Sequence, residues 1–264
     1  ECILGVQPQY VIAATATLNR PDQQQTIMEL TCGLHKIVKI SRKKFIVYRY
    51  NTGIEIEIIL NQQGQPDWSK ITLQQAQSEK RNLLIEQLIQ SNMDRKILVL
   101  TWRSKSHAIP LAQSLRMKGY NVAYMAGTKK SYHDSHILIG TIKKIGTGFD
   151  EKSACEDFNG TRINLLILVG STKSVELLEQ IAGRAFRSDF PQIIHFVDDC
   201  SISVNHWKKS VPWYVSRNGE IYEVNSPYYD PNVTIKGKIL TRQRKQMQHD
   251  IDSTMDEQLK RFQQ

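Results

Sequence analysis

The sequence predicts an α/β protein in which a parallel sheet is flanked by helices. Between residues 96 and 199, short apolar segments alternate with helical segments, an order typical of βαβ units. Hydrophobic residues make up 40% of the chain and charged residues 23%, a globular balance that excludes wholesale disorder. The 264 residues allow one large domain or two smaller ones, at about 150 residues per domain.

The first part of the chain is rich in predicted strands. A short apolar strand is expected at residues 10–14, and β-branched residues dominate residues 36–60. The alternation Ile54-Glu55-Ile56-Glu57-Ile58 indicates half-buried strands, which we expect to be antiparallel. Residues 61–67, with their Gln, Gly and Pro, predict a loop or domain boundary.

The middle of the chain predicts the parallel sheet. A helix is expected at 73–90, a buried strand at 96–100, and a second helix at 106–118 with Gly119 as its C-cap. Further buried strands are expected at 121–125, 136–140, 164–169 and 192–197, with a helix at 174–186 before the last of them.

Beyond residue 199 the pattern predicts a small hairpin-plus-helix extension. Asn218-Gly219 within residues 213–224 is a strong two-residue hairpin signal. Residues 240–262 are highly charged and predict one exposed helix.

Composition excludes several classes of protein. No apolar run approaches the roughly 20 residues of a membrane-spanning helix, and we expect no secretory signal. The four cysteines form no zinc-ligand pattern, so no structural metal is expected and a reducing compartment is favoured. The charge of +9, from 35 Lys and Arg against 26 Asp and Glu, permits a polyanionic partner. Because the chain begins with Glu1 rather than Met, we expect a piece of a longer protein.

The most specific segment is Gln180-Ile181-Ala182-Gly183-Arg184-Ala185-Phe186-Arg187, which fits the pattern QxxGRxxR. On a helix, Gln180, Arg184 and Arg187 would share one face. Two planar guanidiniums there can bind neighbouring phosphate oxygens, and Gly183 allows close approach of a ligand or of a neighbouring backbone. The alternative is a surface helix with two solvated arginines.

A second segment combines a strand end with a glycine-rich loop. Residues 136–141 end in Gly140-Thr141, and Gly146-Thr147-Gly148-Phe149-Asp150 follows. Such a loop places backbone N–H groups at the carboxyl edge of the sheet, where phosphates bind, and Asp150 could accept from a ribose hydroxyl. The alternative is a tight turn followed by a helix-capping Asp.

A third segment, Thr101-Trp102-Arg103, places a hydroxyl, an aromatic ring and a cation at the end of a strand. This trio could hold a nucleic-acid backbone and stack a base. The alternative is that Trp102 belongs to the core or its rim.

In this order the segments resemble the second half of a superfamily 2 helicase. Thr15-Ala16-Thr17 resembles motif III, residues 98–103 motif IV, residues 137–150 motif V, and residues 180–187 motif VI. The resemblance covers roughly residues 10–199 and is greatest to helicases of large cytoplasmic DNA viruses and their phage relatives. The poxvirus transcript-release helicase and its African swine fever virus counterpart exemplify this type.

The resemblance implies a RecA-like fold and a role for each matched residue. Arg184 and Arg187 would be catalytic arginine fingers, with Gln180 ordering their site. Gly148, Asp150 and Gly183 would contact ATP, and Thr101, Trp102, Arg103 and Thr141 would hold nucleic acid. Thr15 and Thr17 would couple ATP hydrolysis to domain closure.

The resemblance also implies a division of the chain and a set of partners. Residues 1–35 would end a first RecA-like domain, 36–66 would be a strand-rich connection, 67–200 the second RecA-like domain, and 201–264 a basic extension. Its partners would be single-stranded or duplex nucleic acid and a first RecA-like domain in cis, with no membrane. A link to transcription machinery, and a location in host cytoplasm or virion, follow from the viral type.

The sequence departs from the family in one respect. It contains no GxxxxGK[ST] phosphate loop and no Asp-Glu-x-His/Asp sequence, so ATP and Mg²⁺ would be held mainly by residues outside it. We therefore expect the 264-residue chain to be inactive without them.

Two other classes of function remain open. Basic residues interleave with aromatics in Trp207-Lys208-Lys209, Trp213-Tyr214 and residues 236–245, which is typical of single-strand binding, although a solvated charged helix is the alternative. The chain could therefore be a nucleic-acid-binding module without an ATP role, or an interaction domain that only docks partners.

Overall fold

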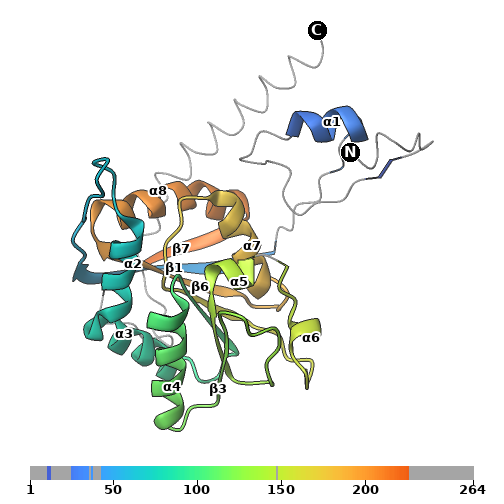
Figure 1. Ribbon diagram of the computed structural model, residues 1–264. Coiled ribbons are helices and arrows are strands. Elements are labelled where there is room, and N and C mark those ends of the chain that lie inside the picture. The colour runs from blue at the N-terminus through green and yellow to red at the C-terminus, as the bar shows by residue number, and fades with distance from the viewer. Residues whose placement is uncertain (1–10, 13–24, 36, 38–42, 147, 226–264) are drawn as a thin grey trace. The chain divides into compact units, whose positions relative to one another are not determined.

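The computed structural model describes residues 11–12, 25–35, 37, 43–146 and 148–225 (Figure 1). The chain divides into two units, Glu1–Ser41 and Arg42–Gln264. In the first unit the described residues include one helix, α1 (Gln25–Cys32). The expected motif III residues Thr15 and Thr17, the strand at 10–14 in large part, and the helix at 240–262 lie outside the described residues.

The second unit is built on a seven-stranded sheet in which every described pair of neighbours is parallel. The strand order is β3-β4-β2-β5-β6-β1-β7. The strands are β1 (Phe45–Glu55), β2 (Ile97–Thr101), β3 (Val122–Met125), β4 (Ile137–Thr141), β5 (Leu165–Leu168), β6 (Gln192–Asp199) and β7 (Gly219–Asn225). The α/β class predicted from the sequence is confirmed.

Helices cover both faces of this sheet (Figure 1). One face packs against α5 (Ile142–Gly146), α7 (Val175–Ala185) and α8 (Ser201–Ser216), and the other against α3 (Glu79–Gln90) and α4 (Ile109–Met117). The remaining elements are α2 (Trp68–Gln77), a π-helical turn η1 (Ser104–Ala108) and α6 (Glu151–Ala154).

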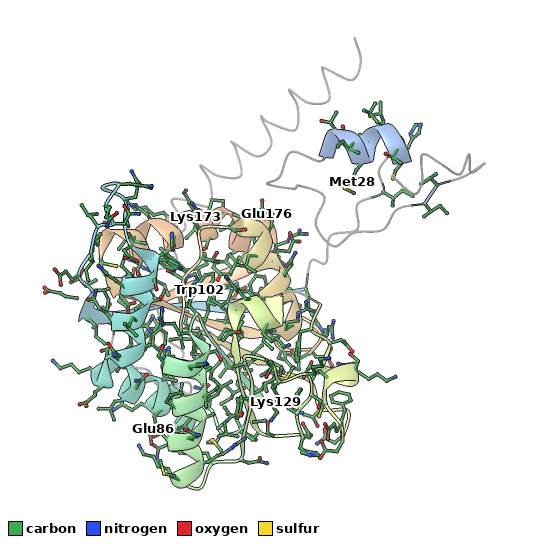
Figure 2. All side chains as sticks on the ribbon, in the orientation of Figure 1. Met28, Glu86, Trp102, Lys129, Lys173 and Glu176 are labelled. Carbon is green, nitrogen blue, oxygen red and sulfur yellow. The ribbon has the colours of Figure 1, made fainter. Side chains whose placement is uncertain are left out.

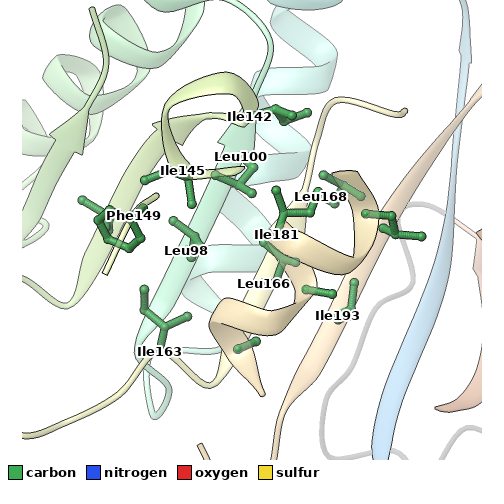
Figure 3. Packing of buried hydrophobic residues seen from close by; sticks show 14 of the residues in the cluster. Leu98, Leu100, Ile142, Ile145, Phe149, Ile163, Leu166, Leu168, Ile181 and Ile193 are labelled. Carbon is green, nitrogen blue, oxygen red and sulfur yellow. The ribbon is translucent and has the colours of Figure 1, made fainter. Parts of the chain in front are cut away.

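The core explains why the central strands could be predicted closely. Alternate residues of β2 point to opposite faces, so Leu98 and Leu100 join one cluster and Ile97 and Val99 the other. Figure 3 shows Leu98 and Leu100 beside Ile181 of α7. Strands buried on both faces read as continuous apolar runs, and these runs are what the sequence displays.

Two predictions at the ends of the sheet are wrong. The segment expected to be antiparallel forms β1, which pairs in parallel with both β6 and β7. The alternation of residues 54–58 falls at the end of β1 and in the loop after it, where Ile56 is buried and Glu57 exposed. Alternation of apolar and polar residues indicates that one face of a strand is covered. It does not determine whether the neighbouring strand runs parallel or antiparallel.

The expected hairpin at 213–224 is also absent from the described structure. Residues 213–216 end helix α8, and β7 pairs with β1 in parallel. Asn218 takes the left-handed conformation with φ 68°, so the Asn-Gly pair terminates a helix instead of joining two strands. The sheet therefore extends over β1 and β7, beyond the predicted 67–200 range at both ends.

One expected helix is divided in two. Ser78 ends α2 through its backbone N–H, which bonds to the Gln74 carbonyl, and caps α3 through its side chain, which accepts from Arg81 N–H. A serine can serve both ends because it favours extended backbone while its hydroxyl accepts from the next helix.

A membrane-spanning segment is not among the described helices, since none combines the necessary length with an apolar composition.

Candidate functional site

The candidate site begins on helix α7, whose buried face fixes which residues can reach a ligand. Ser174 caps the helix by accepting from Leu177 N–H. The apolar residues of α7 are buried against the sheet, namely Leu178, Ile181, Ala182 and Ala185. Gln180, Gly183 and Arg184 lie outside that buried set and are each half-buried.

The turn after α7 carries Arg187. The helix ends at Ala185, Phe186 is its C-cap, and the N–H of Ser188 bonds to the Ala185 carbonyl. Gln180 and Arg184 therefore share a helical face as predicted, while Arg187 lies in the turn beyond. A turn gives Arg187 its own direction, and its guanidinium reaches a residue of the glycine-rich loop.

That residue is Asp150. Arg187 donates from Nη1 to Oδ1 of Asp150, and the two side chains are about one-third exposed, at 34% and 39%. The other carboxylate oxygen, Oδ2, accepts from the N–H of Ser153 and so caps helix α6. The helix-capping alternative for Asp150 is therefore correct, and the same side chain also holds a predicted arginine finger.

A glycine brings these two segments together. A Cβ at Gly146, the last residue of α5, would lie 2.8 Å from Cδ1 of Leu177 in α7. The missing side chain lets α5 pack directly against α7, so the loop that carries Asp150 lies next to the turn that carries Arg187. Gly148 in this loop has φ +70° and is exposed.

The electrostatics of Asp150 follow from its two partners. Burial acts to raise the pKa of Asp150, but the hydrogen bonds from Arg187 and from Ser153 N–H outweigh it. The pKa therefore lies below its ordinary value and the carboxylate is ionised at neutral pH.

Arg184 differs from Arg187 in having an unsatisfied donor. Its Nε is buried and has no hydrogen-bond partner among the described residues. Burial, and next the charge of Arg187, lower the pKa of Arg184 from its ordinary value. A half-buried guanidinium with an unbonded N–H beside a second cation favours binding of an anion, and phosphate oxygens suit that geometry.

Gly183 and Gln180 stay predictions as ligand contacts. A Cβ at Gly183 would meet no atom within 4 Å, so no described neighbour requires a glycine there. This open position leaves space for a ligand, and packing among the described residues supplies no other reason for a glycine there.

The expected nucleic-acid residues lie together at the carboxyl ends of two neighbouring strands. Thr101 ends β2 and Thr141 ends β4, and the two are partners in the strand register. Both are buried, and the Thr101 hydroxyl donates to the carbonyl of Arg103. Arg103 donates to the hydroxyl of Ser106 and to the carbonyl of Ser69.

Trp102 is held by the loop that follows β5. Its Nε1 donates to the Ser171 carbonyl at 2.7 Å, and a Cβ at Gly170 would lie 2.4 Å from its ring. Figure 2 labels Trp102 and, in the same loop as Ser171, Lys173. The ring therefore packs on the rim of the core, as the alternative interpretation held.

Two aromatic residues beside Trp102 were missed by sequence reasoning. The ring of Trp68 lies 5.8 Å from that of Trp102 and 5.4 Å from that of His206, and Nδ1 of His206 is 2.8 Å from the Ser171 hydroxyl. We call Trp68, Trp102 and His206 the aromatic cluster. They come from three distant segments, so no local sequence signal could have grouped them.

The aromatics of the predicted basic extension lie elsewhere. Trp207, Trp213 and Tyr214 belong to helix α8 and are all buried in the core. The interpretation that they stack bases is therefore wrong, because their faces are covered by neighbouring side chains. The remaining basic residues of that region, 236–245, lie outside the described part of the chain.

The chain is similar in sequence to two viral proteins. The chain is 28% identical to "Putative helicase 161L" of Invertebrate iridescent virus 6, over 82% of this chain and 52% of that protein. It is 26% identical to "Putative helicase 055L" of Frog virus 3, over 81% of this chain and 48% of that protein. The chain thus spans about half the length of these curated relatives.

The fold has a counterpart among solved structures. A variant of S. cerevisiae Dbp5 bound to RNA and ADP BeF3 aligns with a TM-score of 0.53 at 12% identity, over 88% of this chain and 54% of that one. No protein-family model matches the chain. The chain is thus similar in sequence to putative helicases of two viruses, and its RecA-like sheet is similar in fold to that of Dbp5.

Proposed function

We propose that this chain is the second RecA-like half of an ATP-driven nucleic-acid helicase, with Arg184 and Arg187 as its arginine fingers. The proposal is based on the hydrogen-bond and ion-pair partners of these two arginines. Arg184 has a buried N–H without a partner among the described residues, and Arg187 is held beside it by a half-exposed carboxylate. A pair of guanidiniums in this arrangement supplies positive charge that the described residues do not fully neutralise.

Such charge suits phosphoryl transfer. Negative charge develops on the transferred phosphoryl group, and a guanidinium placed against it accelerates the reaction by about 10³–10⁵ in related nucleotide hydrolases. Arg187 must exchange Asp150 for phosphate, and an exposed ion pair contributes only about 0–1 kcal/mol, so the exchange costs little.

The nucleotide would be ATP with Mg²⁺, shared with a first RecA-like domain in cis. Gly148, Asp150 and Gly183 would contact it from this side, and Gln180 would order the arginines. The unbonded N–H of Arg184 fits such a ligand. The phosphate loop and the Mg²⁺-holding acid would belong to the other half, with Thr15 and Thr17 coupling the two.

Nucleic acid would cross the carboxyl ends of β2, β4 and β5. Thr101, Trp102, Arg103 and Thr141 lie at the first two strand ends, and the exposed Lys173 follows the third. The aromatic cluster and the basic side chains at this edge suit a strand with its bases and phosphates. We further propose a viral role linked to transcription, in host cytoplasm or virion.

The test is a pair of substitutions in a protein that joins this chain to its ATP-binding half. Arg184→Ala and Arg187→Ala should each lower kcat for ATP at least about 10³-fold and leave nucleic-acid binding largely intact. Arg116→Ala, on the opposite face of the sheet, is the matched control, because the described contacts of its side chain, with the Val122 carbonyl and the Tyr124 ring, lie within the α4–β3 region.

Other results would select the rival functions. Equal loss of nucleic-acid binding would favour a binding module in which the arginines grip the backbone. Unchanged ATPase activity and unchanged binding would favour an interaction domain and contradict the proposal.

A further inference from the structure

The turn that carries Arg187 is held by a segment far away in the sequence. Lys43 donates from Nζ to the carbonyl of Ser188 and pairs with Oδ1 of Asp189 at 3.1 Å. Some 145 residues separate Lys43 from Ser188. Both acceptors follow Arg187 directly in the chain.

The residues after Lys43 hold the same turn on its other side. The ring centroid of Phe45 lies 4.6 Å from that of Phe186, the residue just before Arg187. The N–H of Ile46 bonds to the Pro191 carbonyl at 3.3 Å. Phe45 is only 3% exposed, so this side of the turn rests on the core.

These anchors matter because the turn has little support of its own. Asp189 has 89% of its side chain exposed and Phe190 is 80% exposed. Among the described contacts, those within the turn are the two bonds from Ser188 back to the Ala185 carbonyl. An exposed turn with few internal bonds takes its order from the segments that grip it.

Lys43 also lies at the start of the second unit. The second unit begins at Arg42, so Lys43 is its second residue, immediately after the segment that leads from the first unit.

We propose that Lys43 is a positioning residue for Arg187, fixing the turn so that the guanidinium is oriented toward the phosphate it serves. This inference rests on the proposed function. The Lys43–Asp189 ion pair contributes little because Asp189 is almost fully exposed. The bond to the Ser188 carbonyl carries the effect, since it fixes backbone one residue from Arg187.

The experiment compares two substitutions of Lys43 in the protein that joins this chain to its ATP-binding half. Lys43→Met keeps the aliphatic stem and removes the donor, so kcat for ATP should fall about 5- to 30-fold with KM for ATP changed less than about twofold. Lys43→Arg keeps a donor and should restore most of kcat. Arginine fingers act on the transition state, which is why kcat and not KM should move.

Three controls keep the test specific. Lys118→Met removes a comparable lysine ion pair, with Glu86, on the other face of the sheet and should leave kcat unchanged. Asp189→Asn should also have little effect, because the carbonyl contact remains. Circular dichroism should show that all four variants stay folded.

The outcomes separate the two proposals. Full kcat for Lys43→Met, or an equal fall for Lys43→Arg, would overturn this inference while loss of activity in Arg187→Ala leaves the proposed function standing. Full activity in Arg187→Ala would remove the proposed function itself.

Discussion

Arg187 and Asp150 form an ion pair in which the carboxylate serves two partners at once. Its Oδ1 accepts from Arg187 and its Oδ2 from the backbone N–H of Ser153 at 3.1 Å. A ribose hydroxyl could bind Asp150 only beside or in place of one of them. If the nucleotide binds Asp150 as proposed, a ribose hydroxyl that takes the place of Arg187 would release its guanidinium.

The two roles of Asp150 can be separated by stability measurements on the chain. Asp150→Asn keeps a good N-cap and loses only a half-exposed ion pair, so the free energy of unfolding should fall by less than about 0.5 kcal/mol. Asp150→Ala also loses the cap and should cost about 1 kcal/mol. Urea titration measures both, and equal losses would show that the ion pair, and not the cap, dominates.

Arg184 should be a residue that the fold does not need. Its buried Nε lacks a partner among the described residues, so Arg184→Met removes an unsatisfied donor and keeps the apolar stem. We expect the free energy of unfolding to stay the same or rise by up to about 1 kcal/mol. A loss of more than about 1 kcal/mol in urea unfolding would show that the guanidinium is well bonded in the native state.

Unlike Arg184, a buried network at the end of β6 should contribute strongly to the free energy of unfolding. Asp198 accepts from Arg81 Nε at 2.8 Å, from Thr52 at 2.9 Å and from Gln75 at 2.8 Å, and both charged side chains are 1% exposed. Asp198→Asn leaves the Arg81 charge buried without its counter-ion and should cost about 3–5 kcal/mol.

The control for Asp198 is a surface pair of the same kind. Glu223→Gln breaks the ion pair with Arg49. The side chain of Arg49 is 23% exposed and that of Glu223 is 40% exposed, so the free energy of unfolding should fall by less than about 1 kcal/mol. Chemical denaturation of both variants measures the two losses of unfolding free energy. Similar losses would show that burial does not determine how much an ion pair contributes to stability.

Acid should destabilise the second unit below about pH 6.5. Burial, and next the charge of Arg81, lower the pKa of His107 to about 3; burial, and next nearby Lys209 and Lys173, lower that of His206 to about 4. Between these values and the ordinary pKa the unfolded chain binds more protons, so stability rises with pH and falls as pH decreases.

A single substitution tests that reasoning. His206→Gln removes one of these groups, so the drop in unfolding free energy from pH 7.5 to pH 5 should be smaller than in the wild-type chain. An unchanged drop, measured by urea unfolding at both pH values, would show that His206 does not contribute to the acid sensitivity.

The 264-residue chain should not hydrolyse ATP without further residues. Its sequence has the predicted arginine fingers and lacks a phosphate loop and an Asp-Glu-x-His/Asp sequence. Nucleic-acid-stimulated phosphate release should therefore stay at background. Robust turnover by the purified chain, with Arg187→Ala as the matched inactive control, would contradict this division of the site.

The central sheet could be predicted from sequence because its signal is local. Strands β2, β4 and β5 are fully buried apolar runs, and each was predicted to within one or two residues. The direction of β1 could not be predicted, because it depends on which distant strands pair with it, and β6 and β7 follow it by more than 130 residues.

For the site, too, only the features that depend on residues close in the sequence could be predicted. Gln180 and Arg184 could be placed on one helical face from their spacing. The partner of Arg187, the hold of Lys43 on Ser188 and the grouping of Trp68 with His206 arise only when distant segments meet. None of these contacts has a counterpart in sequence spacing.

The place of β1 in the sheet sets the limits within which this domain can be excised. Because β1 lies between β6 and β7, a fragment that starts at residue 67 would leave β7 with no neighbouring strand and would expose one side of β6. It would also lose Lys43 and Phe45, and with them the grip on the arginine turn. A fragment that begins no later than Arg42 keeps strand order and turn together.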